Sequence, residues 1–406
     1  MWTIATYEAI RLSHFTENAL AGKKGVFELI KASSFKRAVL SLAMSMLGVT
    51  VLAGNVSGGS APGHEISEHD SGYEIVGEFS LRSGDASLEI WKLPPAPGSI
   101  KPKLNTDKDD ADALVELGRK LFFDKRLSVN KDRSCAFCHR PELGWSDGRA
   151  TAEGLEGQAL GRATPSLINA AYGTIFMWDG RAASLEEQAT QPLFNTNEMG
   201  LEPGVLRARL GEDSVYRELF AELFPDLEID VAAVSTAIAA FERTIIVNDT
   251  RFDQWIDGDA TAMTPAEIRG FGVFLDPDRG SCSSCHAAPN FTDQGFHNIG
   301  IESLSDANPD LGRYNIRPVE LMRGAFKTPS LRNIALTAPY FHDGSAESLM
   351  EVVEHYKEGG VQDNLSPEMK DIELSAQEIN DLIAFLHAIS ESSQNLQQNS
   401  ISVAPE

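Results

Sequence analysis

The sequence predicts a mostly α-helical protein in which two parts of the chain are related to each other. Two helix starts are well marked. Thr264-Pro265-Ala266-Glu267 combines a capping box with proline at the first helical position, and Ser375-x-x-Glu378 opens a later helix with one apolar face. The segment 231–245 is likewise helical. No segment alternates apolar and polar residues over the length of a strand, so the predicted class is mostly α.

An internal duplication is the second observation behind this fold class. The segment 116–139, ELGRKLFFDKRLSVNKDRSCAFCH, resembles the segment 267–286, EIRGFGVFLDPDRGSCSSCH. Gly118 and Asp124 of the first copy pair with Gly270 and Asp276 of the second at equal spacing, and each copy ends in C-x-x-C-H. Repetition of this kind indicates two related domains.

The cysteines point to the chemistry of these domains. All four lie in the two motifs, which are Cys135, Cys138 and His139, and Cys282, Cys285 and His286. Disulfides are one alternative, but a chain of 406 residues can bury a core without them. Zinc is another, but the histidines of a zinc knuckle normally follow about a dozen residues later.

C-x-x-C-H is the attachment signature of c-type haem. Both thiols add to the porphyrin vinyl groups, and the adjacent histidine is held under the iron as proximal ligand. The sequence therefore predicts two covalently bound haem c groups, carried by two cytochrome c-like haem domains that arose by duplication.

Export is expected from the N-terminal region. Lys36 and Arg37 precede the apolar run 38–53, which is short for a membrane span and is typical of a signal peptide. Cleavage near Ala53 would send the chain to the periplasm, where c-type haems are attached. The segment 1–35 is either an extended n-region or lies before the true start, and an uncleaved membrane anchor is the alternative.

Net charge indicates which partners are expected, and the positions of the histidines indicate whether the first iron has a second protein ligand. The net charge of -24 argues against nucleic acid as a partner, whereas such a surface could steer a basic redox protein. No histidine lies between Arg140 and Thr250, so the first haem domain supplies no second histidine to its iron. A vacant or water-bound sixth position is expected there, with Met177 and Met199 as alternative ligands.

Three further stretches resemble the bacterial di-haem cytochrome c peroxidase superfamily, which includes the MauG-type enzymes. They are FMWDGRAASLEEQATQPLFNTNEMG, FKTPSLRNIALTAPYFHDG and EVVEHYKEGG, and the match runs in order from Leu114 to Ile389. The resemblance implies a peroxidatic first haem and an electron-transfer second haem. The expected organisation is a signal peptide with extended n-region (1–53), a linker and extended arm (54–100), a peroxidatic haem domain (101–250), an electron-transfer haem domain (251–390) and a polar tail (391–406).

Three catalytic residues follow from the same resemblance. Glu198 matches the distal catalytic glutamate, Gln188 the distal glutamine, and Trp178 the tryptophan between the two haems. These residue types suit the chemistry. Heterolytic O–O cleavage needs a carboxylate that acts as base and then as acid, and an amide can hold peroxide by hydrogen bonds. Trp178 can relay electrons, although a core role is its alternative.

Two departures from typical peroxidases favour the MauG-like subgroup. The loop 140–163 lacks the switchable distal histidine, whose position falls near Leu155. Tyr356 stands where typical peroxidases have a methionine ligand to the second haem, as in MauG-type enzymes. A tyrosinate ligand should lower the potential of that haem. A buried core role for Tyr356, or ligation by His355 instead, are the alternatives.

The resemblance also implies a calcium ion between the domains. Thr337 and Pro339 match its carbonyl donors, but Ala163 stands where the family has an asparagine side chain, so binding should be weak. His297 and His342 are expected to bond haem propionates or backbone.

Three functions remain open at this point. The first is reduction of hydrogen peroxide with electrons from a small c-type cytochrome or copper protein. The second is MauG-type oxidation of tryptophan or tyrosine side chains of a partner protein, against which Gly280 stands near the position of a MauG-type tryptophan. The third is non-enzymatic electron transfer or redox sensing. Peroxidase is preferred because it needs no unseen protein substrate. A homodimer is included among the expected assemblies.

Overall fold

The structure is a computed structural model that describes residues 73–76, 79–97, 108–225, 229–361 and 363–391. The expected signal peptide lies outside the described residues. Within the described ranges, no helix is long and apolar enough to cross a membrane.

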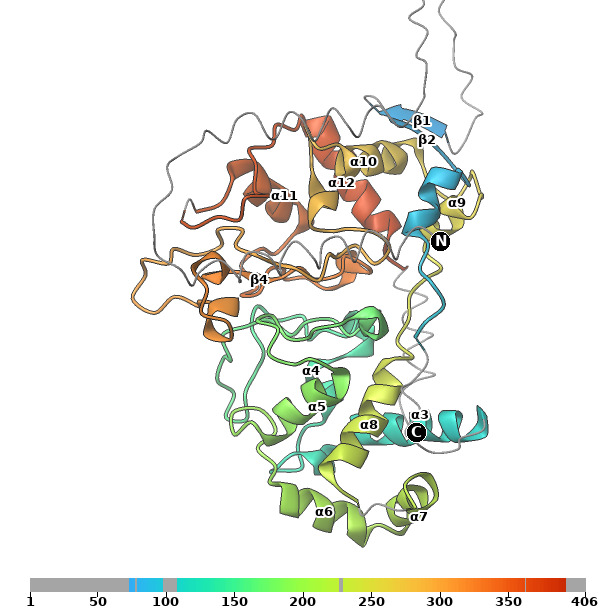
Figure 1. Cartoon of the computed structure of the whole chain (residues 1–406), viewed down its shortest axis with the longest axis vertical. Helices are drawn as coiled ribbons and strands as arrows, with labels where there is room; N and C mark the ends of the chain where they lie inside the picture. The colour runs from blue at the N-terminus through green and yellow to red at the C-terminus, as the bar shows by residue number, and fades with distance from the viewer. Residues whose placement is uncertain (1–72, 77–78, 98–107, 226–228, 362, 392–406) are drawn as a thin grey trace, which may run out of the picture. The chain divides into compact units, whose positions relative to one another are not determined.

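The described chain is mostly helical, as predicted (Figure 1). The helices are α3 (Lys108–Phe122), α4 (Cys135–Cys138), α5 (Leu185–Phe194), α6 (Pro203–Glu212), α7 (Ser214–Leu223), α8 (Val231–Glu242), α9 (Arg251–Ile256), α10 (Pro265–Leu275), α11 (Leu349–Glu358) and α12 (Ala376–Ala388). Two antiparallel pairs of short strands accompany them, β1 (Tyr73–Val76) with β2 (Phe79–Arg82) and β3 (Phe296–His297) with β4 (Phe326–Lys327).

The predicted helix starts are confirmed. Thr264 accepts from the backbone N–H of Glu267, whose carboxylate accepts from the Thr264 N–H in return, and Pro265 is the first residue of α10. Ser375 forms the same reciprocal box at the start of α12. These caps satisfy backbone donors that a helix leaves unpaired at its first turn.

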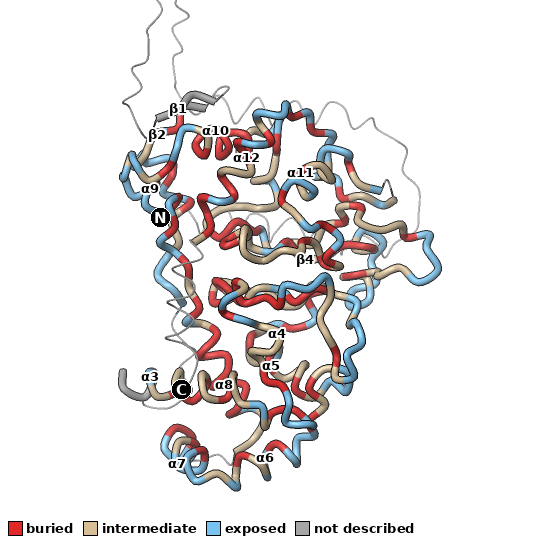
Figure 2. The backbone as a smooth tube through the Cα atoms, turned by 180° about the vertical axis from the view of Figure 1, so that it is seen from behind, coloured by how far each residue is buried: buried red, intermediate tan, exposed pale blue. Residues whose placement is uncertain are grey.

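Each half of the described chain has its own hydrophobic core. In the first core Phe122 of α3 packs against Phe241 of α8, with ring centroids 5.2 Å apart. In the second core Phe271 of α10 packs against Phe385 of α12 at 5.0 Å. Figure 2 shows buried backbone along α8, α10 and α12. The duplicated sequence therefore corresponds to a duplicated helix pair, α3 on α8 and α10 on α12.

Two glycines allow these helix pairs to approach closely. A Cβ added to Gly118 would collide with the carbonyl oxygen of Ala237 on α8, and a Cβ on Gly270 would collide with the carbonyl oxygen of Asp381 on α12. Both collisions are with backbone, which cannot move aside as a flexible side chain can. The two glycines, which occupy equivalent positions in the duplicated segments, thus allow the same close helix contact in both halves.

Gly118→Ala and Gly270→Ala should each destabilise the folded protein by about 2 kcal/mol or more, because the added methyl forces two packed helices apart. Urea unfolding of the haem-loaded protein, followed by circular dichroism, measures the change. Gly211→Ala is the matched control in α6, where an added Cβ meets nothing within 4 Å. It should be neutral or stabilising by up to about 1 kcal/mol. Equal stability of all three variants would contradict this account.

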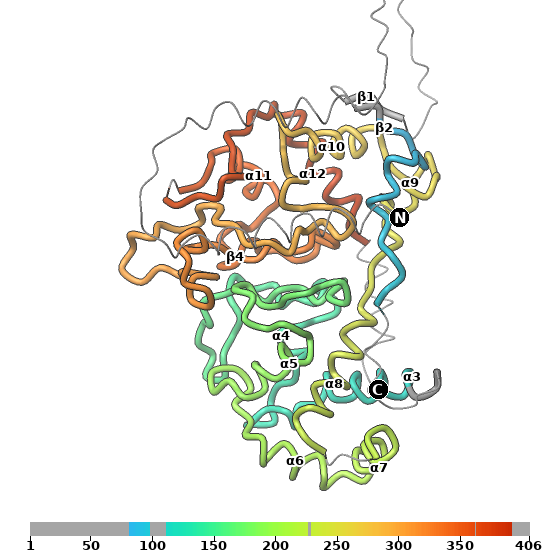
Figure 3. Tube along the Cα trace, in the orientation of Figure 1, coloured from blue at the N-terminus to red at the C-terminus, as the bar shows by residue number. Residues whose placement is uncertain are grey.

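The segment 54–100, expected to be a linker and extended arm, is partly buried in its described part. Leu81, Leu88 and Trp91 are buried in the second core, and the Trp91 ring lies 4.9 Å from that of Phe291. Figure 3 shows this segment (blue) beside α9 (yellow), where the Gly84 N–H donates to the carbonyl of Trp255 at 3.2 Å. The physical reason is the large apolar area of a tryptophan, whose burial outweighs the extended tendency of the prolines that follow it.

Candidate active site

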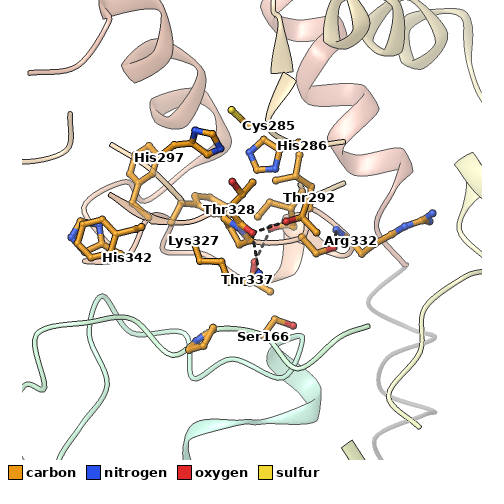
Figure 4. Close-up of a pocket in the computed structure, with 18 of the residues that line it drawn as sticks. Ser166, Cys285, His286, Thr292, His297, Lys327, Thr328, Arg332, Thr337 and His342 are labelled. Atoms are coloured by element: carbon orange, nitrogen blue, oxygen red, sulfur yellow. Dashed lines mark hydrogen bonds between the residues drawn. The ribbon is translucent and has the colours of Figure 1, made fainter. Parts of the chain in front are cut away.

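A single cavity of about 340 Å³ contains most of the predicted site residues. Its walls come from both halves and are mainly apolar. The predicted catalytic, haem-binding and calcium-binding residues that line it are His139, Trp178, Gln188, Cys282, Cys285, His286, Thr337, Pro339 and Tyr356. Cys135, Cys138 and Glu198 do not line it. Figure 4 shows part of this cavity, with Ser166 on the first half facing Thr337 and neighbouring residues on the second.

The two C-x-x-C-H motifs hold their histidines in the same way. In the first, the His139 N–H donates to the carbonyl of Cys135 at 2.9 Å, and in the second His286 donates to Cys282 at 2.8 Å. The Nδ1 atom of His139 lies 3.1 Å from the carbonyl oxygen of Trp145, and His286 repeats this contact with another carbonyl. A carbonyl can only accept, so Nδ1 carries the proton and Nε2 keeps a free lone pair.

Burial keeps both histidines neutral. It lowers the pKa of His139 and lowers the pKa of His286 to about 4. A neutral imidazole is the form that binds iron. The four cysteines are free thiols, so none is used in a disulfide.

The cavity also offers two buried polar groups, one without a hydrogen-bond partner and one with a single carbonyl partner. The Oε1 atom of Gln188 is buried and has no hydrogen-bond partner. Burial lowers the pKa of Lys327 to about 8, and among the described residues its ammonium donates to the Thr328 carbonyl at 3.1 Å. An unpaired amide oxygen and a buried ammonium both call for a polar ligand inside the cavity. Free thiols, neutral histidines and these two groups fit bound haem with its carboxylates.

An ion pair beside the second motif, between the partly buried His297 and the exposed Asp293, was missed by sequence reasoning. His297 Nε2 lies 2.8 Å from a carboxylate oxygen of Asp293. These two residues and Cys285 place ligand atoms within 4.8 Å of one another, which is the geometry of a small metal cluster. Cys285 belongs to the haem motif, however, so the pair belongs to the haem site. The spacing Asp293-x-x-x-His297 was the available signal.

Glu198 lies just after α5, in a turn that orients its side chain. The Glu198 N–H donates to the carbonyl of Asn195 at 3.0 Å, and the Asn195 Nδ2 donates to the Glu198 carboxylate at 2.6 Å. Burial raises the pKa of Glu198, while the hydrogen bond from Asn195 and the charge of Arg181 oppose that rise. Burial, then Asp147 and Glu198, raise the pKa of Cys138 to about 11, so the charge of Glu198 is felt at the first motif.

Trp178 lies where the two halves meet. Its Nε1–H donates to the carbonyl of Ala163 at 2.9 Å. The Ala163 N–H donates to the carbonyl of His342 at 2.7 Å, and the Lys327 N–H donates to the carbonyl of Trp178 at 2.8 Å. Since ATPSLIN (163–169) and KTPSLRN (327–333) are the same stretch in the two copies, these backbone bonds are one contact repeated by the duplication. The rings of Trp178 and His342 are 6.4 Å apart.

Arg162 forms ion pairs that join the two halves beside Trp178. Its guanidinium donates to both carboxylate oxygens of Asp310 at 2.6 and 2.8 Å and to Asp179 at 2.8 Å. It also lies over the ring of Phe326, which stacks on His342 with centroids 3.6 Å apart. A bidentate guanidinium–carboxylate pair fixes orientation as well as distance, so Arg162 holds the surroundings of Trp178 rigid.

Comparison with known proteins agrees with this architecture. Residues 112–261 match the family model of the di-haem cytochrome c peroxidases. The methylamine utilization protein MauG of Methylophilus methylotrophus is 42% identical over 305 residues, which cover 74% of this chain and 88% of that protein. The chain belongs to the di-haem cytochrome c peroxidase family.

Other relatives in this family carry peroxidase names. Cytochrome c551 peroxidase of Nitrosomonas europaea is 34% identical over 292 residues, covering 71% of this chain and 83% of that protein. Among solved structures, a MauG-like protein associated with microbial copper homeostasis matches with a TM-score of 0.66 and 34% identity, covering 74% of this chain and 95% of the other. Membership implies two c-type haems and makes the chain an oxidoreductase of the cytochrome c peroxidase type.

Within this family site, α11 presents Tyr356 and His355 differently. Tyr356 lines the cavity, and burial raises the pKa of its hydroxyl. His355 does not line the cavity, because its Nε2 lies 2.9 Å from the carbonyl of Ile299 and its ring packs against Phe341 at 5.0 Å. Tyr356 also packs against the second core, so the two interpretations of this residue are compatible.

The duplication adds an observation that sequence reasoning missed. Ser184 caps α5 and Ser348 caps α11, each through the same side-chain contact to the third helical residue. Counting from these caps, Pro192 occupies in the first half the position that Tyr356 occupies in the second. A proline side chain has no donor atom for a metal. The sequence signal was the Ser-Leu pair that begins both SLEEQATQP and SLMEVVEHY, from which equivalent positions can be counted.

The two residues expected to donate carbonyls to calcium lie in the wall of the same cavity. Thr337 and Pro339 both line the cavity, but the Ala163 carbonyl accepts from Trp178 and Ala163 brings no side-chain oxygen. Calcium takes six to eight oxygen ligands. Two carbonyls therefore fit only a weak site that water would have to complete.

Proposed function

We propose that this chain is an exported di-haem peroxidase that reduces hydrogen peroxide at the first haem motif, with electrons that enter through the second. Two observations carry the proposal: Gln188 lines the cavity with a buried Oε1 that lacks a partner, and the half-buried acid Glu198 is close enough to the first motif for its charge to act on Cys138. Export to the periplasm rests on the apolar run 38–53, which lies outside the described residues.

An open sixth position at the first haem is part of the proposal. It is supported by Pro192, which stands where the second half has Tyr356, and by the absence of histidine between Arg140 and Thr250. Met199 is 5% exposed, packs in the first core and does not line the cavity, which argues against one of the two alternative methionine ligands. Met177 lines the cavity and remains the other.

The protein side chains then supply the proton chemistry. Haem held by His139 and the thiols of the first motif would supply the iron for peroxide and the route for electrons. Gln188 orients peroxide by hydrogen bonding. Glu198 would take a proton from one peroxide oxygen and return it to the other as the O–O bond breaks, so that H₂O₂, two electrons and two protons give two waters. Asn195 holds the carboxylate for this transfer.

The proposal predicts that the fully oxidised protein reacts with peroxide without prior reduction, because no distal ligand blocks the first iron. Stopped-flow absorbance after mixing ferric protein with hydrogen peroxide measures this. Haem staining after denaturation and the intact mass should first establish a two-haem increment. Reaction that begins only after one-electron reduction would show that an unrecognised ligand, such as Met177, closes the site.

Oxidation of a partner protein by MauG-type chemistry is the second candidate. It is favoured by the 42% identity to a MauG and by Tyr356 in the cavity wall. Against it, a side chain at Gly280 would meet the carbonyl oxygen of Val273 at 2.6 Å, so a tryptophan does not fit at that backbone position. Steady turnover of peroxide with a reduced electron-donor protein, without modification of that donor, favours the peroxidase.

A further inference from the structure

The loop 311–325 exposes three large apolar side chains close together in the sequence. Ile316 and Val319 are each 45% exposed and Leu321 is 55% exposed. They are three of the nine exposed large hydrophobic residues in the described part of the chain, and they fall within six residues. Concentration of this kind marks a surface that another molecule covers.

The loop is fixed in place by hydrogen bonds. The Arg313 N–H donates to the carbonyl of Ala325 at 2.7 Å and closes its neck. At its tip, Asn364 Nδ2 donates to the carbonyls of Glu320 and Arg323, both at 3.0 Å. A surface that is already ordered loses little conformational entropy when a partner binds.

The base of the loop is joined directly to the residue after Trp178. The Arg313 guanidinium donates to the carbonyls of Asp179 at 2.8 Å and Gly180 at 2.6 Å, and it lies over the ring of Phe296. The Lys327 N–H, just beyond the loop, donates to Trp178 itself. A molecule bound to the loop is therefore connected to Trp178 through a few covalent and hydrogen bonds. It is also connected to the second motif, because Phe296 precedes His297, whose ring nitrogen lies within 4.8 Å of Cys285 Sγ.

The charge of the loop differs in sign from that of the chain. Arg317 is exposed and has no ion pair within the described ranges, and Arg323 is paired only at 3.6 Å with the exposed Glu320. The whole chain has a net charge of -24. Repulsion between charges more than about 8 Å apart is screened at physiological salt. The charges on the loop itself therefore determine whether an acidic or a basic partner binds there.

We propose that the loop 311–325 is the docking face for the electron-donor protein, and that this donor is a small acidic redox protein with an apolar docking patch rimmed by carboxylates. Three apolar side chains suit the small interfaces of transient redox complexes. Each docking delivers one electron, so two reduced donors, one H₂O₂ and two protons give two oxidised donors and two waters. The inference rests on the proposed peroxidase function.

The test compares two electron donors on the haem-loaded enzyme. Reduced plastocyanin of the acidic plant type serves as the protein donor, and ascorbate-reduced tetramethylphenylenediamine serves as the small donor. Val319→Ser/Leu321→Ser and, separately, Arg317→Glu should lower kcat/KM for plastocyanin at least fivefold. Peroxide turnover with the small donor should stay unchanged. Val215→Ser and Lys125→Glu, at exposed positions elsewhere, are the controls and should match the wild type with both donors.

The outcomes separate the docking face from the enzyme activity. Loop variants that match the wild type with plastocyanin overturn the proposal, and so does a wild type that accepts basic mitochondrial cytochrome c but not plastocyanin. Loss of turnover with the small donor in the loop variants also overturns it, because the loop would then act on the site and not on docking. A wild type inactive with every donor refutes the peroxidase function itself.

Discussion

Glu198→Gln should slow peroxide turnover by about two to four orders of magnitude, the usual contribution of general acid–base catalysis. Glutamine has nearly the same shape and can still accept the hydrogen bond from Asn195, so both haems and the fold should be retained. The lost property is the ability to take up a proton and return it. Steady-state kinetics, with haem content measured on the same samples, tests this.

The pH dependence of turnover distinguishes this role from a structural one. Glu198 must be ionised to accept the first proton, so kcat/KM should be lost as pH falls through its pKa, which burial has raised. Asn195→Ala removes the hydrogen bond that lowers this pKa, so the acid limb should move to higher pH. Glu202→Gln is the matched control, because Glu202 is exposed and makes no side-chain cap bond to its helix. Unchanged turnover in Glu198→Gln would remove Glu198 from the mechanism.

Local patterns allowed the sequence to predict much of the fold. A capping box such as Thr264 to Glu267 is complete within four residues, and a C-x-x-C-H motif fixes its own histidine through a bond back to the first cysteine. Gly118 and Gly270 could be matched by spacing alone. In each case the contact that fixes the structure joins residues a few positions apart, or occurs in both halves of the duplication.

Contacts between distant residues could not be predicted in this way. Arg162 and Asp310 are 148 residues apart, and neither has a local feature that marks it as the partner of the other. The burial of Trp91 in the second core likewise depends on a tertiary surface. The equivalence of Pro192 with Tyr356 is a different case, because counting from the two serine caps would have revealed it.

Tyr356→Phe should change the absorption spectrum of the second haem and raise its reduction potential. A phenolate is a hard anionic donor that stabilises the oxidised iron over the reduced iron, so its loss has the opposite effect. Burial raises the pKa of the Tyr356 hydroxyl, so ionisation inside this apolar wall requires a cation in contact with the oxygen. Spectroelectrochemical titration of the two haems measures the change.

Two variants serve as controls for this prediction. Tyr340→Phe removes a hydroxyl from a second buried tyrosine in the same cavity wall, and it should leave both spectra unchanged. His355→Ala should cost about 1 kcal/mol of folding free energy through its lost contact with Ile299, without altering either haem.

The first haem should still react with peroxide in Tyr356→Phe, because Gln188 and Glu198 belong to the other half of the chain. Electron delivery should suffer instead, so single-turnover reaction with peroxide persists while steady-state turnover falls. If His355→Ala alters the second haem and Tyr356→Phe does not, the histidine is the ligand. The raised pKa of Tyr356 would then reflect burial in the second core alone, and the likeness to MauG at this position would lose its main support.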